Sequence, residues 1–329
     1  MRILVTGGAG FIGSHYVRTL LAGGYPGYED AAVTVLDKLT YAGNLANLDP
    51  VAGRFDFVHG DICDPELLLR VVPGHHAVLN FAAETHVDRS IAGAAEFVNS
   101  NVAGVQSLLD ACMTAEVARI VHVSTDEVYG SIAAGSWTER SPVDPNSPYA
   151  AAKAAGDLLA LAYARTHGVN VSVTRCCNNY GPYQYPEKII PLFATNLLDG
   201  KPVPLYGDGL NVRGWVHADD HCRGVQLVLE RGRPGRVYHV NGDTELTNRE
   251  LTAAILDACG ASWDLVIPVA DRKGHDRRYS LDDSLLRSMG YAPRVPFSDG
   301  LKATVQWYAA NRAWWAPLSR SAAGAPADR

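Results

Sequence analysis

The sequence predicts an α/β protein with a doubly wound parallel sheet and a smaller α/β lobe in its C-terminal half. Three observations support this prediction. Over the first 175 residues, β-branched apolar runs alternate with helical stretches, as in parallel strands joined by crossover helices. Glycines gather at the junctions between these runs. Hydrophobic residues make up 47% of the 329 residues, which is enough for a sizeable core and excludes a disordered chain.

The first part of the chain contains six short apolar runs typical of strands and four longer periodic stretches typical of helices. The expected strands are Ile3 to Val5, Val33 to Leu36, Phe55 to Val58, Ala77 to Phe81, Arg119 to Ser124 and Asn170 to Thr174. Apolar residues three and four positions apart predict helices over Ile12 to Ala22, Pro65 to Val72, Ala95 to Ala115 and Tyr149 to His167.

After Arg175 the sequence becomes richer in Gly, Pro and Asn. Helices are expected there near Ile189 to Asp199, His221 to Glu230, Asn248 to Ala258 and Ser298 to Asn311. We expect residues 1–175 to form the sheet domain, with 213–240 returning to it, and residues 176–212 and 241–315 to form the second lobe. Residues 316–329, rich in Ala, Ser and Gly, are expected to form a flexible tail.

Composition and charge exclude several classes of function. The net charge is −6 and no block of Lys and Arg appears, so we expect no nucleic-acid partner. The six cysteines form no Cys-x-x-Cys pair and show no zinc spacing, which indicates reduced thiols and no metal site. No charge-free run approaches the roughly 18 residues of a membrane span, and the N-terminus lacks a signal-peptide core. A cytoplasmic protein without a membrane partner is therefore expected.

A glycine-rich turn follows the first expected strand and opens the first expected helix. Gly7, Gly10 and Gly13 allow a tight turn and a close backbone approach, while the helix N-terminus offers free N–H groups to a pyrophosphate. Asp37, at the end of the second strand, is placed to hydrogen-bond an adenosine ribose and to repel a 2′-phosphate. The pattern predicts a dinucleotide-binding (Rossmann) domain that prefers NAD to NADP. Lys38 beside Asp37 weakens that preference, and a merely structural glycine turn is the alternative.

Two further segments are expected to lie near the cofactor. Asp61 and Ile62, at the end of the third strand, are expected to contact the edge and the face of the adenine ring. Ala82 and Ala83 let the chain pass close to the cofactor after the fourth strand. Ordinary loop and core filling is the alternative for these four residues.

Tyr149 and Lys153 lie one helical turn apart, so that the phenol and the ammonium share one face. A phenol is a poor base at neutral pH, but an adjacent ammonium and a nicotinamide cation favour its anion. Thr125, Asp126 and Glu127 close the fifth expected strand, at the edge where an open sheet binds its ligands. These residues predict a catalytic cluster, and a solvated acidic pair at a strand end is the alternative.

These segments resemble the extended short-chain dehydrogenase/reductases, and Thr125-Asp126-Glu127-Val128-Tyr129-Gly130 narrows the resemblance to the dTDP-glucose 4,6-dehydratases. The segments that match the same family are Asp37 to Asn44, His86 to Ser90, Asn178 to Tyr183, Pro186 to Lys188, Tyr206 to Gly209 and Asp271 to Asp276. The resemblance spans about residues 1 to 315. Three positions depart from the family pattern: Thr85 and Cys177 stand where Ser is usual, and Gly214 where Asp is common.

The resemblance implies a reaction in which water is lost across C5 and C6 of a hexose. Oxidation of C4 to a ketone comes first, because it makes the C5 hydrogen acidic. In this oxidation Tyr149 takes the O4 proton as hydride passes to NAD, while Lys153 holds the cofactor ribose and lowers the pKa of the tyrosine. Thr125 hydrogen-bonds the new carbonyl, Glu127 removes the C5 proton and Asp126 protonates the departing C6 hydroxyl. Return of the hydride to C6 regenerates NAD, so the net reaction is a dehydration.

The resemblance also implies the remaining binding residues. Further cofactor contacts are expected from Phe11, Ile12, Lys38, Leu39, Thr40, Phe81, Ser100 and Asn179. Contacts to the substrate, dTDP-glucose, are expected from Thr85, Thr125, Asn178, Glu187, Lys188, Ile189, Pro204, Leu205, Tyr206, Arg213, Asn248, Arg272, His275 and Tyr279.

The resemblance also implies a homodimer, and the long helices that begin at Ala95 and Tyr149 are expected to form its interface because their apolar stripes are wider than one core face needs. Two other functions remain as alternatives. One is a nucleotide-sugar 4-epimerase or decarboxylase on the same scaffold, and the other is a non-catalytic NAD-sensing protein. The adjacent acid and base, Asp126 and Glu127, are the feature that the first alternative does not need.

Overall fold

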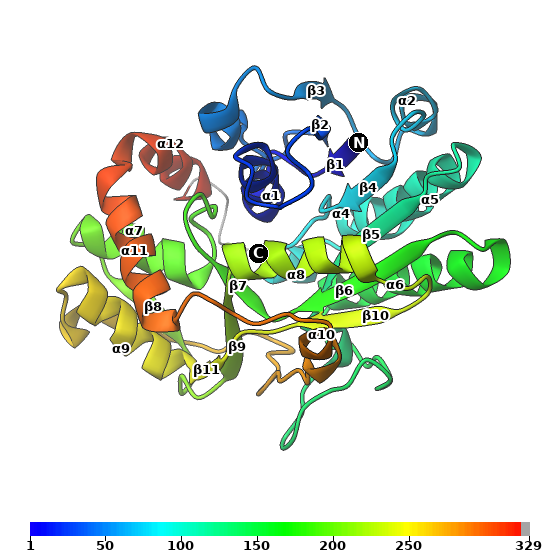
Figure 1. The fold of residues 1–329 in the computed structure, drawn as a ribbon. Helices are drawn as coiled ribbons and strands as arrows, with labels where there is room; N and C mark the ends of the chain where they lie inside the picture. The colour runs from blue at the N-terminus through cyan, green and yellow to red at the C-terminus, as the bar shows by residue number, and fades with distance from the viewer. Residues whose placement is uncertain (324–329) are drawn as a thin grey trace.

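A parallel sheet of seven strands forms the middle of the computed structural model, which describes residues 1–323 (Figure 1). The strand order is β10-β6-β5-β4-β1-β2-β3, and every neighbouring pair is parallel. The order reverses between β1 and β4, and sheets of this kind bind ligands at the carboxyl ends of the strands beside such a reversal. The strands are β1 (Arg2–Thr6), β2 (Ala32–Asp37), β3 (Asp56–His59), β4 (Ala77–Asn80), β5 (Arg119–Thr125), β6 (Val171–Cys176) and β10 (Val237–Val240).

Helices cover both faces of this sheet. On one face, α1 (Phe11–Leu21) and α8 (Ala218–Arg231) pack with the strands into one hydrophobic core. On the other face, α2 (Pro65–Val71), α5 (Gly104–Thr114) and α6 (Pro148–His167) complete a second core. Because the strands are buried on both sides, they read as continuous apolar runs in the sequence instead of alternating ones.

The second lobe has a core of its own and lies at one end of the large sheet (Figure 1). Its strands form a three-stranded sheet in the order β11-β9-β7 and a two-stranded sheet of β12 and β8. Helices pack on these sheets through buried residues such as Phe193, Leu251 and Tyr308. The elements are β7 (Asn178–Tyr180), β8 (Val203–Tyr206), β9 (Val212–His217), β11 (Thr244–Thr247), β12 (Val266–Val269), α7 (Ile189–Leu198), α9 (Asn248–Cys259), α11 (Phe297–Ala310) and α12 (Arg312–Ala323).

Several short helices connect these elements. They are α3 (Val87–Ala92), α4 (Ala95–Val98), α10 (Ser284–Ser288) and the 3₁₀ turns Leu45–Val51, Asp126–Tyr129 and Trp263–Leu265. None of the helices within residues 1–323 has the length and apolarity needed to cross a membrane.

The six expected strands and the eight expected helices have counterparts in the structure, and the predicted fold class is confirmed. One helix differs in detail. The stretch expected as a single helix over Ala95 to Ala115 contains a π-helical turn, Asn99–Ala103, between α4 and α5. Within that turn the Asn101 side chain accepts from the Glu84 N–H and donates to the Glu84 carbonyl, each at 2.9 Å. The wider turn therefore ties this helix to the chain that follows β4.

Residues 316–323, the start of the expected flexible tail, are helical in the structure, because α12 continues to Ala323. Two tryptophans anchor the start of this helix. Trp315 is 2% exposed and donates to the Tyr308 carbonyl at 2.7 Å, and Trp314 donates to Asn47 Oδ1 at 3.0 Å. The rest of that prediction, residues 324–329, lies outside the described part of the chain.

The Gly7→Ala variant should lower the free energy of unfolding by about 2–4 kcal/mol. Gly7 has φ of +68°, and an added Cβ would lie 2.5 Å from the Ala82 backbone nitrogen, so both the backbone and the neighbouring strand end must shift. Gly23→Ala is the matched control, because its φ is +77° but nothing lies within 4 Å of the added atom. We expect a loss of about 1–2 kcal/mol there, from backbone strain alone. Urea unfolding measures both, and equal losses would contradict the close approach.

Candidate active site

A cleft of about 420 Å³ lies where the carboxyl ends of β1, β4, β5 and β6 face the second lobe. This volume is within the range of small-molecule sites. The cleft brings together most of the residues expected to bind or react. They are Gly7, Gly10, Phe11, Ile12, Gly13, Phe81, Ala83, Thr85, Thr125, Asp126, Glu127, Tyr149, Lys153, Asn178, Asn179, Glu187, Lys188, Ile189, Pro204, Tyr206, Arg213, Asn248, Arg272, His275 and Tyr279.

The glycine turn is held in place by the second strand. The Gly7 N–H donates to the Leu36 carbonyl at 2.8 Å, and the Asp37 carboxylate accepts from the N–H groups of Ala9 at 2.9 Å and Leu39 at 2.8 Å. Burial raises the pKa of Asp37, and these N–H groups oppose the shift. Helix α1 begins after Gly10 without a side-chain cap, so its first N–H groups remain available to an anion in the cleft.

Lys38 and Asp61 form an ion pair at the far end of the glycine turn, with 2.8 Å between Nζ and Oδ2. The other Asp61 oxygen accepts the Cys63 N–H at 2.9 Å. Lys38 is thus paired with a carboxylate, and the positive charge that weakened the preference for NAD over NADP is balanced locally.

Several expected site residues lie beside the cleft and do not line it. Ile62 is 5% exposed because its side chain fills the core under α2 and α5. Leu205 is also buried, and its side chain packs against the Gly209 turn. The expected residues that do not line the cleft are Asp37, Lys38, Leu39, Thr40, Asp61, Ile62, Ala82, Ser100 and Leu205.

Asp126 is a buried carboxyl group directly after β5, with an exposed fraction of 2%. Burial, reinforced by the charge of Glu127, raises the pKa of Asp126 to about 8. The Thr125 hydroxyl lies 3.3 Å from Oδ1, and Oδ2 has no hydrogen-bond partner among the described residues. At neutral pH this side chain is therefore a protonated acid with an oxygen free for a ligand.

Glu127 lies among positive side chains at the same strand end. Burial raises the pKa of Glu127, whereas Lys188, Arg272 and Arg213 lower it. Its backbone N–H donates to the Thr125 hydroxyl at 3.2 Å, which fixes the turn that carries both carboxyl groups. The two neighbouring carboxyl groups thus have different surroundings, and only Glu127 faces three cations. This difference suits one acid and one base.

Tyr149 and Lys153 point into the cleft from α6, as their spacing predicts. Burial and then the charge of Glu127 raise the pKa of Tyr149 well above its usual value, and the Thr125 hydroxyl opposes the shift. Lys153 donates from Nζ to the Val123 carbonyl at 2.8 Å, and burial lowers its pKa. Burial is therefore the largest influence on the pKa of Tyr149 in the protein alone, and the lowering expected from Lys153 remains a prediction.

A buried carboxylate that the sequence reasoning missed lies behind Lys153. Asp157 is fully buried, accepts from Arg175 Nε at 2.8 Å, and has His122 Nε2 at 3.5 Å. Its charge raises the pKa of Lys153 against the effect of burial. The signal was present in the sequence, because Asp157 follows Lys153 by one helical turn on α6.

Cations of the second lobe are positioned by backbone carbonyls and aromatic rings. Arg213 donates from Nη2 to the Asp276 carbonyl at 2.8 Å, and its guanidinium lies 4.1 Å from the centre of the Tyr279 ring. Lys188 donates from Nζ to the Thr85 carbonyl at 2.7 Å. Because neutral carbonyls hold these side chains, their charge remains available to a negatively charged ligand.

The rim of the cleft contains a contact between the lobes that sequence reasoning did not find. The Arg89 guanidinium lies 3.7 Å from the centre of the Tyr41 ring and 3.4 Å from Glu187 Oε2. Most other missed lining residues are neighbours of matched segments or of strand ends. The missed residues are Ala42, His86, Val87, Asp88, Val123, Ser124, Cys176, Cys177, Gln184, Tyr185, Ile190, Leu192, Phe193 and Trp215.

Two of the three departures from the family pattern touch each other. A Cβ added to Gly214 would lie 3.1 Å from the Cβ of Cys177 and 3.0 Å from Asn241 Oδ1. Cys177 is itself 4% exposed and lines the cleft. The absence of a side chain at position 214 thus leaves room for the Cβ of Cys177, which lies between β6 and β7.

A doubly wound domain with a glycine turn, a Tyr-Lys pair and a second lobe over the cleft defines an extended short-chain dehydrogenase/reductase. The family model described as GDP-mannose 4,6 dehydratase matches residues 4–304. A dTDP-glucose 4,6-dehydratase of Streptomyces niveus is 62% identical over 333 residues, which cover 100% of this chain and 99% of that protein. The chain belongs to this family of nucleotide-sugar 4,6-dehydratases, in its dTDP-glucose 4,6-dehydratase branch.

Solved structures agree with this assignment. DesIV, a dTDP-glucose 4,6-dehydratase from Streptomyces venezuelae crystallised with NAD and TYD bound, matches with a TM-score of 0.95 and 64% identity, over 97% of this chain and 100% of that one. A UDP-glucose 4-epimerase from Thermus thermophilus in complex with NAD matches with a TM-score of 0.86 and 33% identity, over 94% and 99% of the two chains. The resemblance found in the sequence is confirmed.

Proposed function

We propose that the protein is an NAD-dependent lyase that converts dTDP-glucose to dTDP-4-keto-6-deoxyglucose. The observation that carries this proposal is the buried Asp126, whose pKa is raised, beside Glu127 in the cleft that also holds Tyr149 and Lys153. An elimination of water needs an acid and a base together, whereas a 4-epimerase needs only the Tyr-Lys pair. Relatives that are 58% to 62% identical carry the name of this dehydratase.

The residues of the first domain fit NAD. Gly7 leaves no room for a side chain between the turn and Ala82, and the uncapped N-terminus of α1 offers N–H groups to a pyrophosphate. Asn179 Oδ1 is buried without a hydrogen-bond partner among the described residues, and Asn179 lines the cleft. NAD, when bound there, supplies an acceptor for the C4 hydride and later returns that hydride to C6.

The side chains of the protein carry the proton transfers. Tyr149 takes the O4 proton, and the Lys153 ammonium near it offsets the negative charge that forms on the phenol. Thr125 holds the carbonyl oxygen by a hydrogen bond. Glu127 takes the C5 proton, since the cations around it favour its anion, and Asp126 gives its proton to the leaving O6.

The second lobe supplies contacts to the nucleotide sugar. The diphosphate lies near the cations Lys188, Arg213 and Arg272, and the base stacks on Tyr206, which is 38% exposed at the end of β8. We assign residues 1–175 and 218–240 to NAD binding and residues 176–217 and 241–315 to substrate binding; the expected boundary at residue 213 moves because β9 (Val212–His217) pairs with β7 and β11. The position of β10 beside β6 supports the return of the chain to the first domain.

Incubation with dTDP-glucose in heavy water tests this function. We expect a 6-deoxy-4-ketose nucleotide that carries deuterium at C5, seen by proton NMR. A sugar that keeps its C6 hydroxyl and is inverted at C4 would show an epimerase. Purified protein that binds NAD but leaves each sugar nucleotide unchanged would show a non-catalytic binding protein.

The rate of water loss should fall as pH rises through about 8, because Asp126 must carry a proton to give it to O6. The acid form is populated below the pKa and lost above it, so kcat should drop about tenfold per pH unit well above 8. Steady-state kcat between about pH 6 and pH 10 measures this limb. A constant kcat up to pH 10 would contradict a role for this proton.

A homodimer in the cytoplasm remains part of the proposal. Apolar residues one turn apart on α6 are exposed or half-buried, namely Ala151, Ala155, Leu158 and Ala162, and Leu158 is 53% exposed. Such a stripe suits the face of a symmetric helical interface. The native mass should be that of two chains, and Leu158→Glu should shift it to one. A wild-type monomer at micromolar concentration would overturn the assembly.

A further inference from the structure

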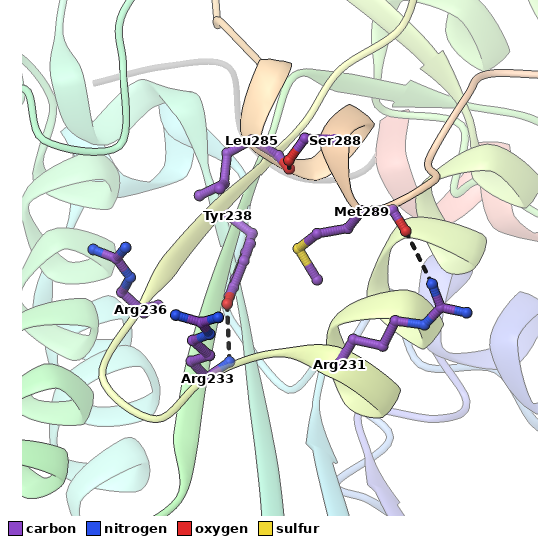
Figure 2. A pocket seen from close by; sticks show the side chains of 7 residues that line it. All are labelled: Arg231, Arg233, Arg236, Tyr238, Leu285, Ser288 and Met289. Carbon is purple, nitrogen blue, oxygen red and sulfur yellow. Dashed lines mark hydrogen bonds between the residues drawn. The ribbon is translucent and has the colours of Figure 1, made fainter.

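A second pocket, of about 380 Å³, lies at the edge of the large sheet opposite the cleft (Figure 2). It forms where the chain enters β10, between the end of α8 and α10. Since β10 runs parallel to β6, residues before Val237 lie at the amino ends of the strands. The residues proposed to react lie at the carboxyl ends. The pocket is therefore separate from the cleft.

Three arginines line this pocket within one short segment, Arg231-Gly-Arg233-Pro-Gly-Arg236. Figure 2 shows Arg233 and Arg236 on one side, Arg231 on the other, and Tyr238 and Met289 between them. Arg231 donates to the Met289 carbonyl at 3.1 Å. None of the three makes an ion pair with a carboxylate of the described residues.

Several other surface arginines in the second half of the chain are paired with carboxylates. Arg277 lies 2.9 Å from Asp208, Arg278 lies 2.9 Å from Glu245, and Arg287 lies 2.6 Å from Asp243. In a chain of net charge −6, these three neighbouring guanidinium groups form a local positive surface without carboxylate partners among the described residues. Like charges repel, so an anion bound among them would stabilise their grouping.

The segment that carries these arginines is fixed by hydrogen bonds. The Arg233 N–H donates to the Tyr238 hydroxyl at 2.9 Å, and its carbonyl accepts from Ser172 Oγ at 3.0 Å. Gly232 N–H donates to the Val228 carbonyl and Gly235 N–H to the Val171 carbonyl, both at 2.8 Å. The backbone that carries the three arginines is thus fixed before any ligand arrives, which lowers part of the entropy cost of binding.

Tyr238, Leu285 and Met289 give the pocket an apolar floor, which favours a ligand with an organic part beside its negative charge. Tyr238 is 3% exposed, and Leu285 and Met289 are half-buried beside it. We propose that the pocket binds a small phosphate ester, whose phosphate oxygens accept from Arg233 and Arg236 and whose organic part lies on this floor. Planar guanidinium groups match phosphate oxygens in pairs, and the volume suits a molecule the size of a nucleoside monophosphate.

Calorimetric titration of thymidine 5′-monophosphate into the NAD-loaded protein tests this site, with the binding step of the pocket resolved from that of the cleft by a fit to two sites. We expect saturable binding, and binding of inorganic phosphate that is about tenfold weaker because it leaves the apolar floor uncovered. The double variant Arg233→Glu, Arg236→Glu should bind thymidine monophosphate at least tenfold more weakly. The double variant Arg233→Lys, Arg236→Lys should lose less, because it keeps the charge but not the paired geometry.

The matched control is the double variant Arg54→Glu, Arg70→Glu, which makes the same charge change at two exposed arginines away from the pocket. It should bind like the wild type. Thermal melting checks that each variant is folded. Absence of saturable binding to the wild type would overturn the proposal, and so would an equal loss in the control variant, which would show a general effect of net charge.

Discussion

Asp126→Asn should form the final 6-deoxy product about 10² to 10⁴ times more slowly, while oxidation at C4 continues. Asparagine fills the same buried space, where Asp126 is 2% exposed, but it has no carboxylic proton to give to the leaving oxygen. Burial and the charge of Glu127 keep that proton on Asp126 at neutral pH, with a pKa of about 8, and the amide cannot replace it.

Two measurements distinguish this effect from a general loss of activity. The absorbance of the reduced cofactor should rise on mixing with substrate and then persist, because the next step is blocked. The C5 hydrogen of the bound sugar should still exchange with heavy water, since Glu127 is intact. Asp49→Asn, an exposed carboxylate outside the cleft, should behave like the wild type. A variant with normal product formation would remove Asp126 from the acid role.

Glu127→Gln should lower product formation by a similar factor of about 10² to 10⁴, but by stopping an earlier proton transfer. A glutamine cannot take the C5 proton, so deuterium should no longer enter at C5. The charge of Glu127 raises the pKa values of both Tyr149 and Asp126, so its removal should lower them. Oxidation at C4 is therefore expected to be no slower than in the wild type.

The comparison of the two variants is the sharpest measurement, because they share a location and a size change and differ only in the proton that each handles. Reduced cofactor should accumulate in both, and solvent exchange at C5 should survive only in Asp126→Asn. Exchange that survives in Glu127→Gln would assign the base role to another residue. Exchange lost in both variants would show that the pair acts as one unit.

Much of the first domain could be predicted from the sequence because its signals are local. The strands β1, β2, β4 and β5 are buried on both faces and read as short apolar runs. The glycine turn can be recognised once the strand before it is located, and the Tyr149-Lys153 spacing once the helix that contains it is located. Asp126 and Glu127 were found because the end of a strand, once located, fixes which edge of the sheet they reach.

The second lobe was harder to predict for a physical reason. The strand β7 has three residues and β11 has four, and each is paired with β9, which is distant in sequence from the first and antiparallel to the second. Pairing between distant segments leaves no periodicity within either one. The same applies to α12, whose start is held by Trp314 contacting Asn47, and to the Tyr41-Arg89-Glu187 contact at the rim.

The effect of Lys153 also could not be read from its spacing. A lysine one turn from a tyrosine predicts a charge that stabilises the phenolate. In the structure Nζ donates to the Val123 carbonyl, and the strongest influence on Tyr149 is its own burial. Which influence on the pKa of Tyr149 is largest depends on how deeply the tyrosine is buried and on where the Lys153 side chain points, and the sequence alone gives neither.

The contact between Gly214 and Cys177 limits how this chain can be moved back toward the usual family sequence. Introducing aspartate at position 214 alone would force its β-carbon against the Cβ of Cys177 and against Asn241 Oδ1. The cost of that exchange should depend on what occupies position 177, so the energies of the two substitutions should not add. Anyone who swaps sequence between this protein and its relatives should therefore treat the two positions as one inherited unit.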